Sequence, residues 1–272
     1  MPRYFSFLSL LVILFIAPSC SKVPLTNRKQ VNLVPESELV GLSLTQYKDF
    51  LSKNAVVNAS ETDAQMVKRV GAKIQGAVVR YLNQNKLGSR VAGYNWEFNL
   101  VKDSAINAWC MPGGKVVVYT GLLPVTQNET ALAIVMGHEI AHAVARHGNE
   151  RMSQEMLTQL GGTALDVALA SKSAETRAIF DQAYGVSTTV GLLLPYSRLH
   201  ESEADKLGLI FAAMAGYDPH EATKFWQRMA AKGGAKPPAL LSTHPSDQTR
   251  INDLNKFMPE ALKYYKPTGN QK

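Results

Sequence analysis

The sequence predicts an α+β fold that is mostly helical and contains a small antiparallel β-meander. Three observations support this class. Apolar residues recur at helical spacing from Met66 to Leu82, three short strands with tight connections follow between Tyr94 and Leu123, and the rest of the chain is almost entirely helical in pattern. A helix, then a meander, then helices is the element order of an α+β protein. With 272 residues, the chain is long enough to bury one sizeable core.

The first nineteen residues have the pattern of an export signal. Arg3 gives a positive start, an apolar stretch runs from Phe5 to Ala17, and small residues precede Cys20. The apolar stretch is shorter than the roughly 20 residues that a bilayer span needs. The residues before Cys20 resemble a bacterial lipobox, with Ala17 in place of the usual Leu. Residues 1–19 are therefore expected to be a lipoprotein signal peptide, and a plain secretory signal is the alternative.

Cysteine usage fits a lipid anchor and excludes a disulfide scaffold. Cys20 and Cys110 are the only cysteines, so lipidation of Cys20 leaves Cys110 as a free thiol. Several acyl chains on one residue anchor a protein firmly in a membrane. By resemblance to enterobacterial lipoprotein sorting, Ser21 favours the outer membrane. We therefore expect a bacterial envelope protein that faces the periplasm and has the membrane as one partner.

The net charge of +7 does not indicate a nucleic-acid partner. Lys and Arg residues are scattered along the chain, and no nucleic-acid motif accompanies them. Such a charge is typical of a solvated basic surface. We expect no nucleic-acid binding.

The mature chain divides into three parts. Residues 20–58 are expected to be a lipidated adaptor whose second half becomes amphipathic. Residues 59–265 form the main domain, which opens with a helix-capping signal at Ser60. Residues 266–272 are a polar tail. Charged residues interrupt the Gly-, Ala- and Leu-rich segment 160–195, which favours a helical pair packed on the domain over a membrane hairpin.

Three strands are predicted in the centre of the chain. Residues 94–101 alternate apolar and polar side chains, and residues 104–111 form a second strand. The Pro-Gly-Gly turn at 112–114 leads into a third strand at 115–123. The tight connections favour an antiparallel meander with the third strand at an edge.

A helix is predicted around the stretch MGHEIAHAVARH. Thr126 and Glu129 form a Thr-x-x-Glu capping box ahead of an apolar run, and Gly148 supplies a C-terminal stop. His147 is expected in the last turn, where the helix dipole favours a histidine. The longer metzincin pattern fails here because Ala145 stands where that pattern has Gly.

This helix carries a candidate metal site. His138 and His142 lie at i and i+4 on one helix face, where two imidazoles can chelate one ion. Glu139 lies beside them and can reach a water on that ion. Two surface histidines with a chance glutamate are the alternative, which the apolar helix disfavours because buried unpaired histidines are costly. The pattern predicts one zinc ion per chain.

A second helix supplies the third candidate ligand. Glu201 and Asp205 lie at i and i+4 on a helix with an apolar side. Because catalytic zinc usually takes three protein ligands, Glu201 is the predicted third one. Asp205 is predicted to accept the free ring N–H of a zinc-bound histidine. A solvated acidic helix start is the alternative, and Glu203, on another face, is expected to be solvated.

These motifs together resemble those of a known family. In order, NAWCMPGGKVVVYTGLL, HEIAH, ESEAD and LSTHPSDQTRI are similar to the zinc metallopeptidase family that includes HtpX, the CaaX prenyl proteases and the mitochondrial Oma protease. VPLTNRKQVNLV resembles the opening of its bacterial lipoprotein branch. The resemblance covers nearly all of the mature chain. It implies a zincin-type metalloprotease domain of the gluzincin kind, although this chain lacks the membrane-spanning segments of HtpX and the prenyl proteases.

The chemistry that the resemblance implies is metal-assisted peptide hydrolysis. Glu139 would take a proton from water on the zinc and pass it to the leaving amine. Tyr196, His244 and Arg250 are the candidates for the oxyanion donor. Resemblance to the lipoprotein branch offers His244 a second role, in which it occupies the open zinc position in a self-inhibited state. A plain turn histidine is the alternative for that residue.

Substrate recognition is expected at a strand edge. Val116, Val117 and Val118 would pair with an extended substrate by β-augmentation, which implies weak sequence preference and suits unfolded chains. Two functions stay open. One is a zinc metalloendopeptidase acting on misfolded or misassembled envelope proteins. The other is an envelope chaperone or assembly factor that uses a repressed protease fold as a binding module.

Overall fold

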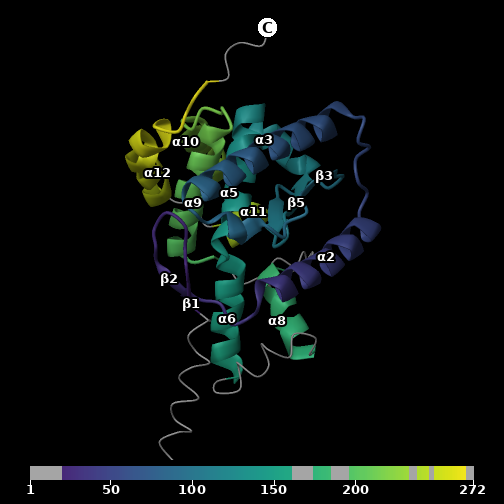
Figure 1. The fold of residues 1–272 in the computed structure, drawn as a ribbon. Helices are drawn as coiled ribbons and strands as arrows, with labels where there is room; N and C mark the ends of the chain where they lie inside the picture. Colours follow the sequence, from purple (N-terminus) through teal and green to yellow (C-terminus); the bar gives the residue numbers. More distant parts are fainter. Residues whose placement is uncertain (1–19, 161–173, 185–195, 233–237, 245–247, 268–272) are drawn as a thin grey trace, which may run out of the picture.

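The computed structural model describes residues 20–160, 174–184, 196–232, 238–244 and 248–267. The expected signal peptide and the last five residues of the predicted polar tail lie outside this part of the chain. Figure 1 shows helices gathered around helix α5 (Glu129–Ala145), with a small sheet to one side and an N-terminal hairpin to the other. The predicted class, α+β and mostly helical, is confirmed.

Helix α5 forms the centre of the core. Its residues from 131 to 145 are all buried, as expected of a helix that is apolar around most of its circumference. Asn128 caps the helix by accepting a hydrogen bond from the Ala131 N–H at 2.8 Å. The predicted capping box is therefore wrong. Thr126 ends the preceding short helix α4 (Leu123–Thr126), where its hydroxyl donates to the Leu123 carbonyl.

The C-terminal end of α5 also differs from the prediction. The helix ends at Ala145, and Arg146 takes a left-handed conformation with φ 62°. A new helix, α6 (His147–Leu160), begins at the next residue. Gly148 is therefore not the helix stop, and His147 opens α6 instead of closing α5. The predictions failed because a non-glycine residue took the left-handed position that usually favours Gly.

Helix α9 (Arg198–Met214) packs very closely along α5. A Cβ on Gly208 would lie only 2.9 Å from the backbone nitrogen of His138, and one on Gly137 would lie 3.0 Å from the Gly208 carbonyl oxygen. Two facing glycines thus allow the backbones to approach. Helix α3 (Thr62–Gln84) packs against both helices. The contact between α5 and α9 places the first turns of α9 beside the histidines of α5.

The three predicted strands are present, but they do not form a meander. They are β3 (Glu97–Val101), β4 (Ala108–Met111) and β5 (Lys115–Tyr119), in the spatial order β3-β5-β4. β5 runs parallel to β3 and antiparallel to β4. The predicted edge at Val116–Val118 is therefore wrong, because β5 is the middle strand. All five of its residues are buried, including Lys115, and the apolar run Val116–Tyr119 is typical of a strand covered on both faces.

A small antiparallel sheet occurs instead at the start of the described chain. β1 (Cys20–Lys22) and β2 (Lys29–Val31) form the N-terminal hairpin, whose loop takes left-handed conformations at Leu25 and Asn27. Val23 from this hairpin belongs to the main apolar core. Helix α2 (Glu36–Lys53) follows and packs near β5. The segment 20–58 thus lies against the main domain.

The remaining helices complete the core. Helix α8 (Ala174–Tyr184) packs on α6 and lies within the predicted helical pair, the rest of which is outside the described residues. Tyr184 occupies the space where a side chain on Gly148 would lie. The other elements are α10 (Glu221–Ala231), α11 (Ala239–Thr243), α12 (Gln248–Leu262) and the 3-10 turns η2 (Gly88–Val91) and η3 (Thr120–Leu122).

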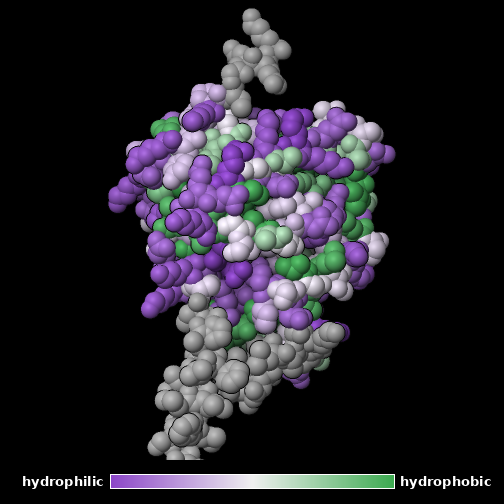
Figure 2. All heavy atoms as spheres, viewed as in Figure 1, coloured by the Kyte–Doolittle hydropathy of each residue, from purple (hydrophilic) through white to green (hydrophobic). Residues whose placement is uncertain are grey.

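The surface is polar on the face shown in Figure 2, where hydrophilic residues predominate and apolar spots are small. Among the described residues, the exposed large hydrophobic side chains lie on separate segments: Leu44, Val56, Val79, Leu157 and Leu199. Exposed hydrophobic residues that are scattered singly are normal. Within the described part of the chain, no helix has both the length and the apolar composition needed to cross a bilayer.

Candidate metal centre and active site

Three predicted ligands meet between α5 and α9. His138 and His142 are both buried, and their Nε2 atoms lie 3.1 Å apart. Glu201 brings Oε1 to 3.3 Å from His142 Nε2 and Oε2 to 3.5 Å from His138 Nε2. Ser197 caps α9 by accepting a hydrogen bond from the His200 N–H, so Glu201 lies in the first turn. The structure therefore brings these three side chains together as the spacing predicted.

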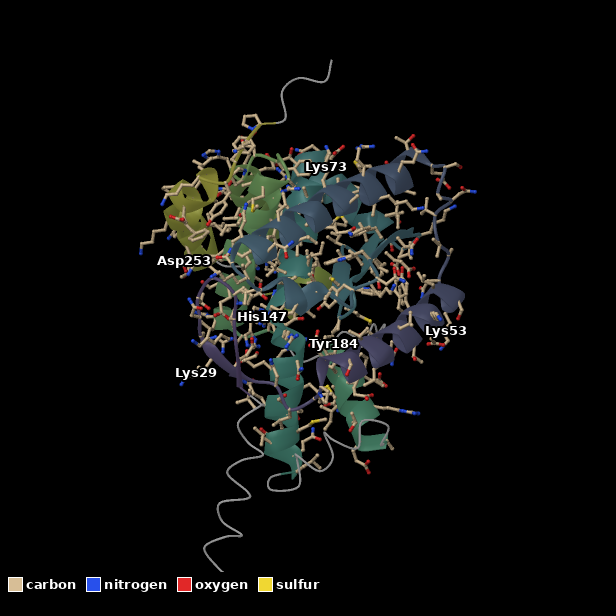
Figure 3. All side chains as sticks on the ribbon, in the orientation of Figure 1. Lys29, Lys53, Lys73, His147, Tyr184 and Asp253 are labelled. Carbon is tan, nitrogen blue, oxygen red and sulfur yellow. The ribbon has the colours of Figure 1, made fainter. Side chains whose placement is uncertain are left out.

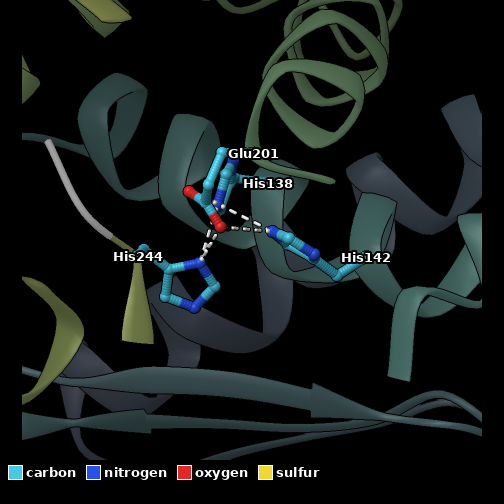
Figure 4. Close-up of side chains that lie close together, drawn as sticks. All are labelled: His138, His142, Glu201 and His244. Carbon is cyan, nitrogen blue, oxygen red and sulfur yellow. Dashed lines mark hydrogen bonds and ion pairs between the residues drawn. The ribbon is translucent and has the colours of Figure 1, made fainter. Parts of the chain in front are cut away.

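His244 joins them as a fourth member. It follows α11, and its Nδ1 lies 2.9 Å from Glu201 Oε1 and 3.2 Å from His138 Nε2. The ligand atoms of His138, His142, Glu201 and His244 all lie within 4.8 Å of one another. Figure 4 shows the three rings and the carboxylate converging on one point. We call these four residues the metal cluster.

The donor set of the metal cluster fits a bound cation. His138 Nε2 faces two other ring nitrogens and a carboxylate oxygen. A single ring nitrogen carries either one proton or one lone pair, so hydrogen bonds cannot satisfy all these contacts. A cation at their centre would accept every lone pair at once. Imidazole nitrogens and a carboxylate are ligands that Zn²⁺ takes in tetrahedral sites.

Glu139 lies beside the metal cluster with an unused oxygen. The residue is 4% exposed, and its Oε1 has no hydrogen-bond partner among the described residues. The same Oε1 lies 3.5 Å from His244 Nε2, within ion-pair distance. Burial raises the pKa of Glu139, although nearby His244 and His138 oppose the shift. A buried carboxylate with a free oxygen and a raised pKa suits a general base.

Asp205 lies where the sequence placed it, beside a candidate ligand. Its Oδ1 is 3.0 Å from His138 Nδ1, and accepting that N–H leaves Nε2 unprotonated for a metal. Arg250, from α12, donates to both Asp205 oxygens at 2.8 and 2.7 Å and lies 2.8 Å from Glu201 Oε2. Its guanidinium also covers the ring of Trp226 at 3.4 Å. Arg250 thus holds two carboxylates of the site in place in this conformation.

Tyr196 lies against the metal cluster together with His244. Its ring centroid is 3.8 Å from that of His142 and 5.0 Å from that of His244. The Tyr196 N–H donates to the Thr243 carbonyl at 3.2 Å, which ties Tyr196 to the residue before His244. The guanidinium of Arg151 lies 3.6 Å from the Tyr196 ring centroid. The segments that carry Tyr196 and His244 are therefore joined at the site.

Sequence reasoning missed a second buried network next to the metal cluster. Glu203 is 1% exposed, so the prediction that it is solvated is wrong, because the N-terminal hairpin and α6 cover that face of α9. It contacts Arg28 and His147, while Glu150 contacts Arg28 and His200. No spacing rule pairs residues so distant in sequence. The single available signal was the motif VPLTNRKQVNLV, which contains Arg28.

The charges of this network follow from its contacts. Burial alone would raise the pKa values of Glu150 and Glu203, but hydrogen bonds outweigh it, from Arg28 and His200 to Glu150 and from His147 and Arg28 to Glu203. Both pKa values fall to about 2. Burial lowers the pKa of His147 to about 4 despite its hydrogen bond to Glu203. The network therefore pairs two carboxylates with the Arg28 cation at neutral pH.

The fold and the site together define a class of protein. Two histidines and a glutamate on one helix, with an acidic residue from a second helix, are the arrangement of zincin-type metallopeptidases. The sequence profile of peptidase family M48 matches residues 69–258, which is more than half of the chain. The chain belongs to peptidase family M48, and the predicted metallopeptidase class is confirmed.

Several curated proteins are similar to this chain. The mitochondrial metalloendopeptidase OMA1 of Schizosaccharomyces pombe is 33% identical over 243 residues, covering 88% of this chain and 66% of that protein. The human mitochondrial metalloendopeptidase OMA1 is 30% identical over 260 residues, covering 93% and 49%. A putative beta-barrel assembly-enhancing protease of Vibrio cholerae is 35% identical over 178 residues, covering 62% and 35%. The chain thus spans from about a third to two thirds of these relatives.

Proposed function

We propose that this protein is a zinc metalloendopeptidase that hydrolyses misfolded or misassembled proteins of the bacterial cell envelope. His138, His142 and Glu201 would hold one zinc ion per chain, and lipidated Cys20 would anchor the protein in the outer membrane, facing the periplasm. The observation that carries the proposal is the buried metal cluster with a Glu139 oxygen beside it that has no hydrogen-bond partner among the described residues.

The chain's own residues have distinct parts in this chemistry. Zinc bound here supplies a Lewis acid that makes water more acidic and polarises a peptide carbonyl. Glu139 Oε1 would accept the water proton and then return it to the leaving amine. Asp205 keeps His138 in one tautomer. Because Arg250 is held by Asp205 and Glu201, we assign the oxyanion donor to Tyr196 or His244, rearranged when substrate binds.

Substrate binding is reassigned to β4. β5 is the middle strand, whereas β4 has one strand neighbour in the described sheet and packs against α5. An extended substrate can pair with such an edge through its backbone. Just before β4, the Ile106 carbonyl accepts a hydrogen bond from the Leu240 N–H at 3.2 Å. An arriving strand would compete with this segment, which leads to His244, and so would help to withdraw His244 from the metal cluster.

The envelope location rests on two supports. The segment before Cys20 resembles a lipobox, as described above. Bacterial relatives are named beta-barrel assembly-enhancing proteases, in Vibrio cholerae and in Yersinia pestis. The OMA1 proteins that are similar to this chain are mitochondrial, so they do not support a bacterial location. A lipid-anchored enzyme that acts on unfolded or misassembled envelope proteins is consistent with the bacterial names.

The test compares the wild-type protein with Glu139→Gln. About one zinc per chain in both proteins is expected, because Glu139 is not a ligand. Cleavage of unfolded casein should fall by about 100-fold or more in the variant, since the general base is lost. Two outcomes would contradict the proposal. One is a zinc-free wild-type protein that cleaves casein as fast as the zinc-loaded protein, and the other is equal cleavage by the two zinc-loaded proteins.

Self-inhibition by His244 is a second, separable prediction. His244 is the fourth member of the metal cluster, and a catalytic zinc site normally leaves its fourth position open for water. His244→Ala should therefore raise casein cleavage several-fold without loss of the zinc ion. His220→Ala serves as the matched control, because His220 is an exposed histidine that pairs with Asp218 outside the metal cluster. A fall in cleavage with His244→Ala would instead favour His244 as the oxyanion donor.

The alternative function, a chaperone or assembly factor with repressed cleavage, is favoured by the same His244 contact. A cell in which Glu139→Gln fully replaces the wild-type protein would support that alternative. Loss of envelope function with Glu139→Gln, at wild-type protein level, would support the peptidase.

A further inference from the structure

Each histidine of α5 has a second ring nitrogen, and both of these nitrogens have partners. For His138, Nδ1 faces Asp205, which is held by Arg250. For His142, Nδ1 lies 3.0 Å from Nδ1 of His147. The Nδ1 partner of His142 is thus another histidine, whereas the Nδ1 partner of His138 is a carboxylate. The orientation of His142 therefore depends on what holds His147.

The chain of contacts continues from His147 to a carboxylate and a cation. His147 Nε2 lies 3.2 Å from Glu203 Oε2. Glu203 accepts hydrogen bonds from Arg28 Nε at 3.1 Å and from Arg28 Nη2 at 2.9 Å. Because a carboxylate only accepts, His147 Nε2 carries the proton and its Nδ1 is the acceptor. His142 therefore donates from Nδ1, which leaves its Nε2 with a free lone pair toward the metal cluster.

Arg28 is the cation at the end of this series of contacts. It also reaches Glu150, from Nη1 at 2.6 Å and from Nη2 at 2.7 Å. Glu150 and Glu203 are buried, at 4% and 1% exposure, and two buried carboxylates side by side need a cation. Thr26, from the same loop, donates to Glu203 Oε1 at 2.6 Å. Figure 3 shows His147 inside the molecule near the N-terminal hairpin, whereas Lys29 lies at its periphery.

We propose that Arg28 of the N-terminal hairpin is a positioning residue of the metal centre, acting through Glu203 and His147 to orient the ring of His142. The inference rests on the proposed zinc site. A similarity between the two metal-facing histidines supports it. Contacts lead from each of them to a carboxylate of α9 and then to an arginine, directly for His138 and through His147 for His142. The matched family profile begins at residue 69, so family membership does not assign this part to the hairpin.

The proposal gives the N-terminal segment a role beyond that of a tether. The hairpin begins at Cys20, the expected lipidation site, and one of its loop residues completes the support of a metal-facing histidine. Loss of such outer contacts typically lowers metal affinity by 10- to 100-fold. The hairpin would then help set zinc affinity, and a cleavage or displacement of this segment would weaken the centre.

The test measures zinc dissociation constants of the full chain by competition with a chromogenic chelator. The variants are Arg28→Gln and His147→Phe, which interrupt the path from Arg28 through Glu203 and His147 to His142, here called the relay. Arg69→Gln is the matched control, because Arg69 forms an ion pair with Glu129 that shares no residue with the relay or with the metal cluster. The absorption spectrum of the cobalt-substituted protein serves as a second readout, because it reports ligand geometry directly.

Both relay variants are expected to raise the zinc dissociation constant about 10- to 100-fold and to alter the cobalt spectrum. The double variant should bind zinc no more weakly than the weaker-binding single variant, since both changes interrupt the same path. Arg69→Gln should leave the zinc dissociation constant within about twofold of wild type. If Arg28→Gln fails to fold, Arg28→Lys decides, because it keeps the positive charge but lacks the planar fork that bridges Glu150 and Glu203.

Folded relay variants that bind zinc within about twofold of wild type would overturn the proposal. So would an equal loss of affinity in Arg69→Gln, which would show that the effect is not specific to the relay. A wild-type protein that binds zinc but cleaves no protein would refute the proposed activity and leave the relay supported by its affinity data. A wild-type protein that binds no zinc would refute both.

Discussion

Single residues of this protein owe their charge states to the partners that burial leaves them. Glu139 and Glu150 are equally buried, at 4% exposure. Glu139 has a free oxygen, and burial raises its pKa. Burial acts on Glu150 in the same direction, but hydrogen bonds from Arg28 and His200 outweigh it and lower its pKa to about 2. The same side chain is thus suited to accept a proton in one place and to remain an anion at neutral pH in another.

Glu150 predicts part of the acid sensitivity of the protein. Its folded pKa of about 2 lies below the ordinary value of 4.5, so its stabilisation is complete above about pH 4.5 and is lost as pH falls toward 2. Glu150→Gln should lower the free energy of unfolding at pH 7 by on the order of 1–3 kcal/mol and flatten its fall between pH 4.5 and 2. Urea unfolding at a series of pH values measures this.

Glu61→Gln is the control, because Glu61 is exposed at the start of α3. An unchanged acid slope in Glu150→Gln would show that other carboxylates carry the effect.

At the scale of elements, the contact between α5 and α9 decides whether the site exists. Facing glycines at 137 and 208 bring the two backbones together. As a result, Glu201 can reach both histidines of α5. Helix packing at ordinary separation, with side chains larger than Gly at the crossing, would hold the carboxylate away from the rings.

Gly208→Ala is the element-level prediction. Its Cβ would meet backbone atoms of His138 at 2.9 and 3.0 Å, which cannot rotate away. We expect a loss of about 2 kcal/mol in the free energy of unfolding, together with weaker zinc binding. Chemical denaturation and chelator competition measure the two effects.

Gly41→Ala, in α2, is the matched control, because nothing lies within 4 Å of a Cβ there. That change should be neutral or stabilise the protein by up to about 1 kcal/mol. Equal stability of the two variants would contradict the close-packing argument.

At the scale of the whole molecule, the metal cluster ties together distant parts of the chain. It draws ligand atoms from α5, from α9 and from the residue after α11, and the further network adds the N-terminal hairpin. A ligand that binds only the folded state stabilises it by mass action. The protein's thermal stability should therefore depend on its metal.

Chelation should lower the melting temperature, and added zinc should restore it. At zinc concentrations about 1,000 times the dissociation constant, binding contributes about 4 kcal/mol, which corresponds to a shift on the order of 10 °C. Glu201→Gln should show little response to either treatment. Identical melting curves for wild-type protein with and without chelator would show that the metal cluster does not contribute to stability.

The histidine and carboxylate spacings were readable from sequence, because i and i+4 positions share a helix face wherever the helix lies. His138 and His142 therefore share one face of α5, and Glu201 and Asp205 share one face of α9. The close contact of the two helices then brings the pairs together as expected. The strand segments were also readable from their apolar patterns. The strand order was not, because an alternating or apolar run does not state which neighbour it pairs with, and β5 proved to lie between β3 and β4.

The sequence by itself determined the class of the protein and the candidate ligands, since both depend on short-range spacing along helices and on motifs in order. Tertiary structure alone decided the rest. It brought His244 to the metal cluster, buried Glu203 and placed Arg28 between two glutamates. Arg28 and Glu203 are 175 positions apart, and no local pattern encodes a contact that forms only when a hairpin, two helices and their burial come together.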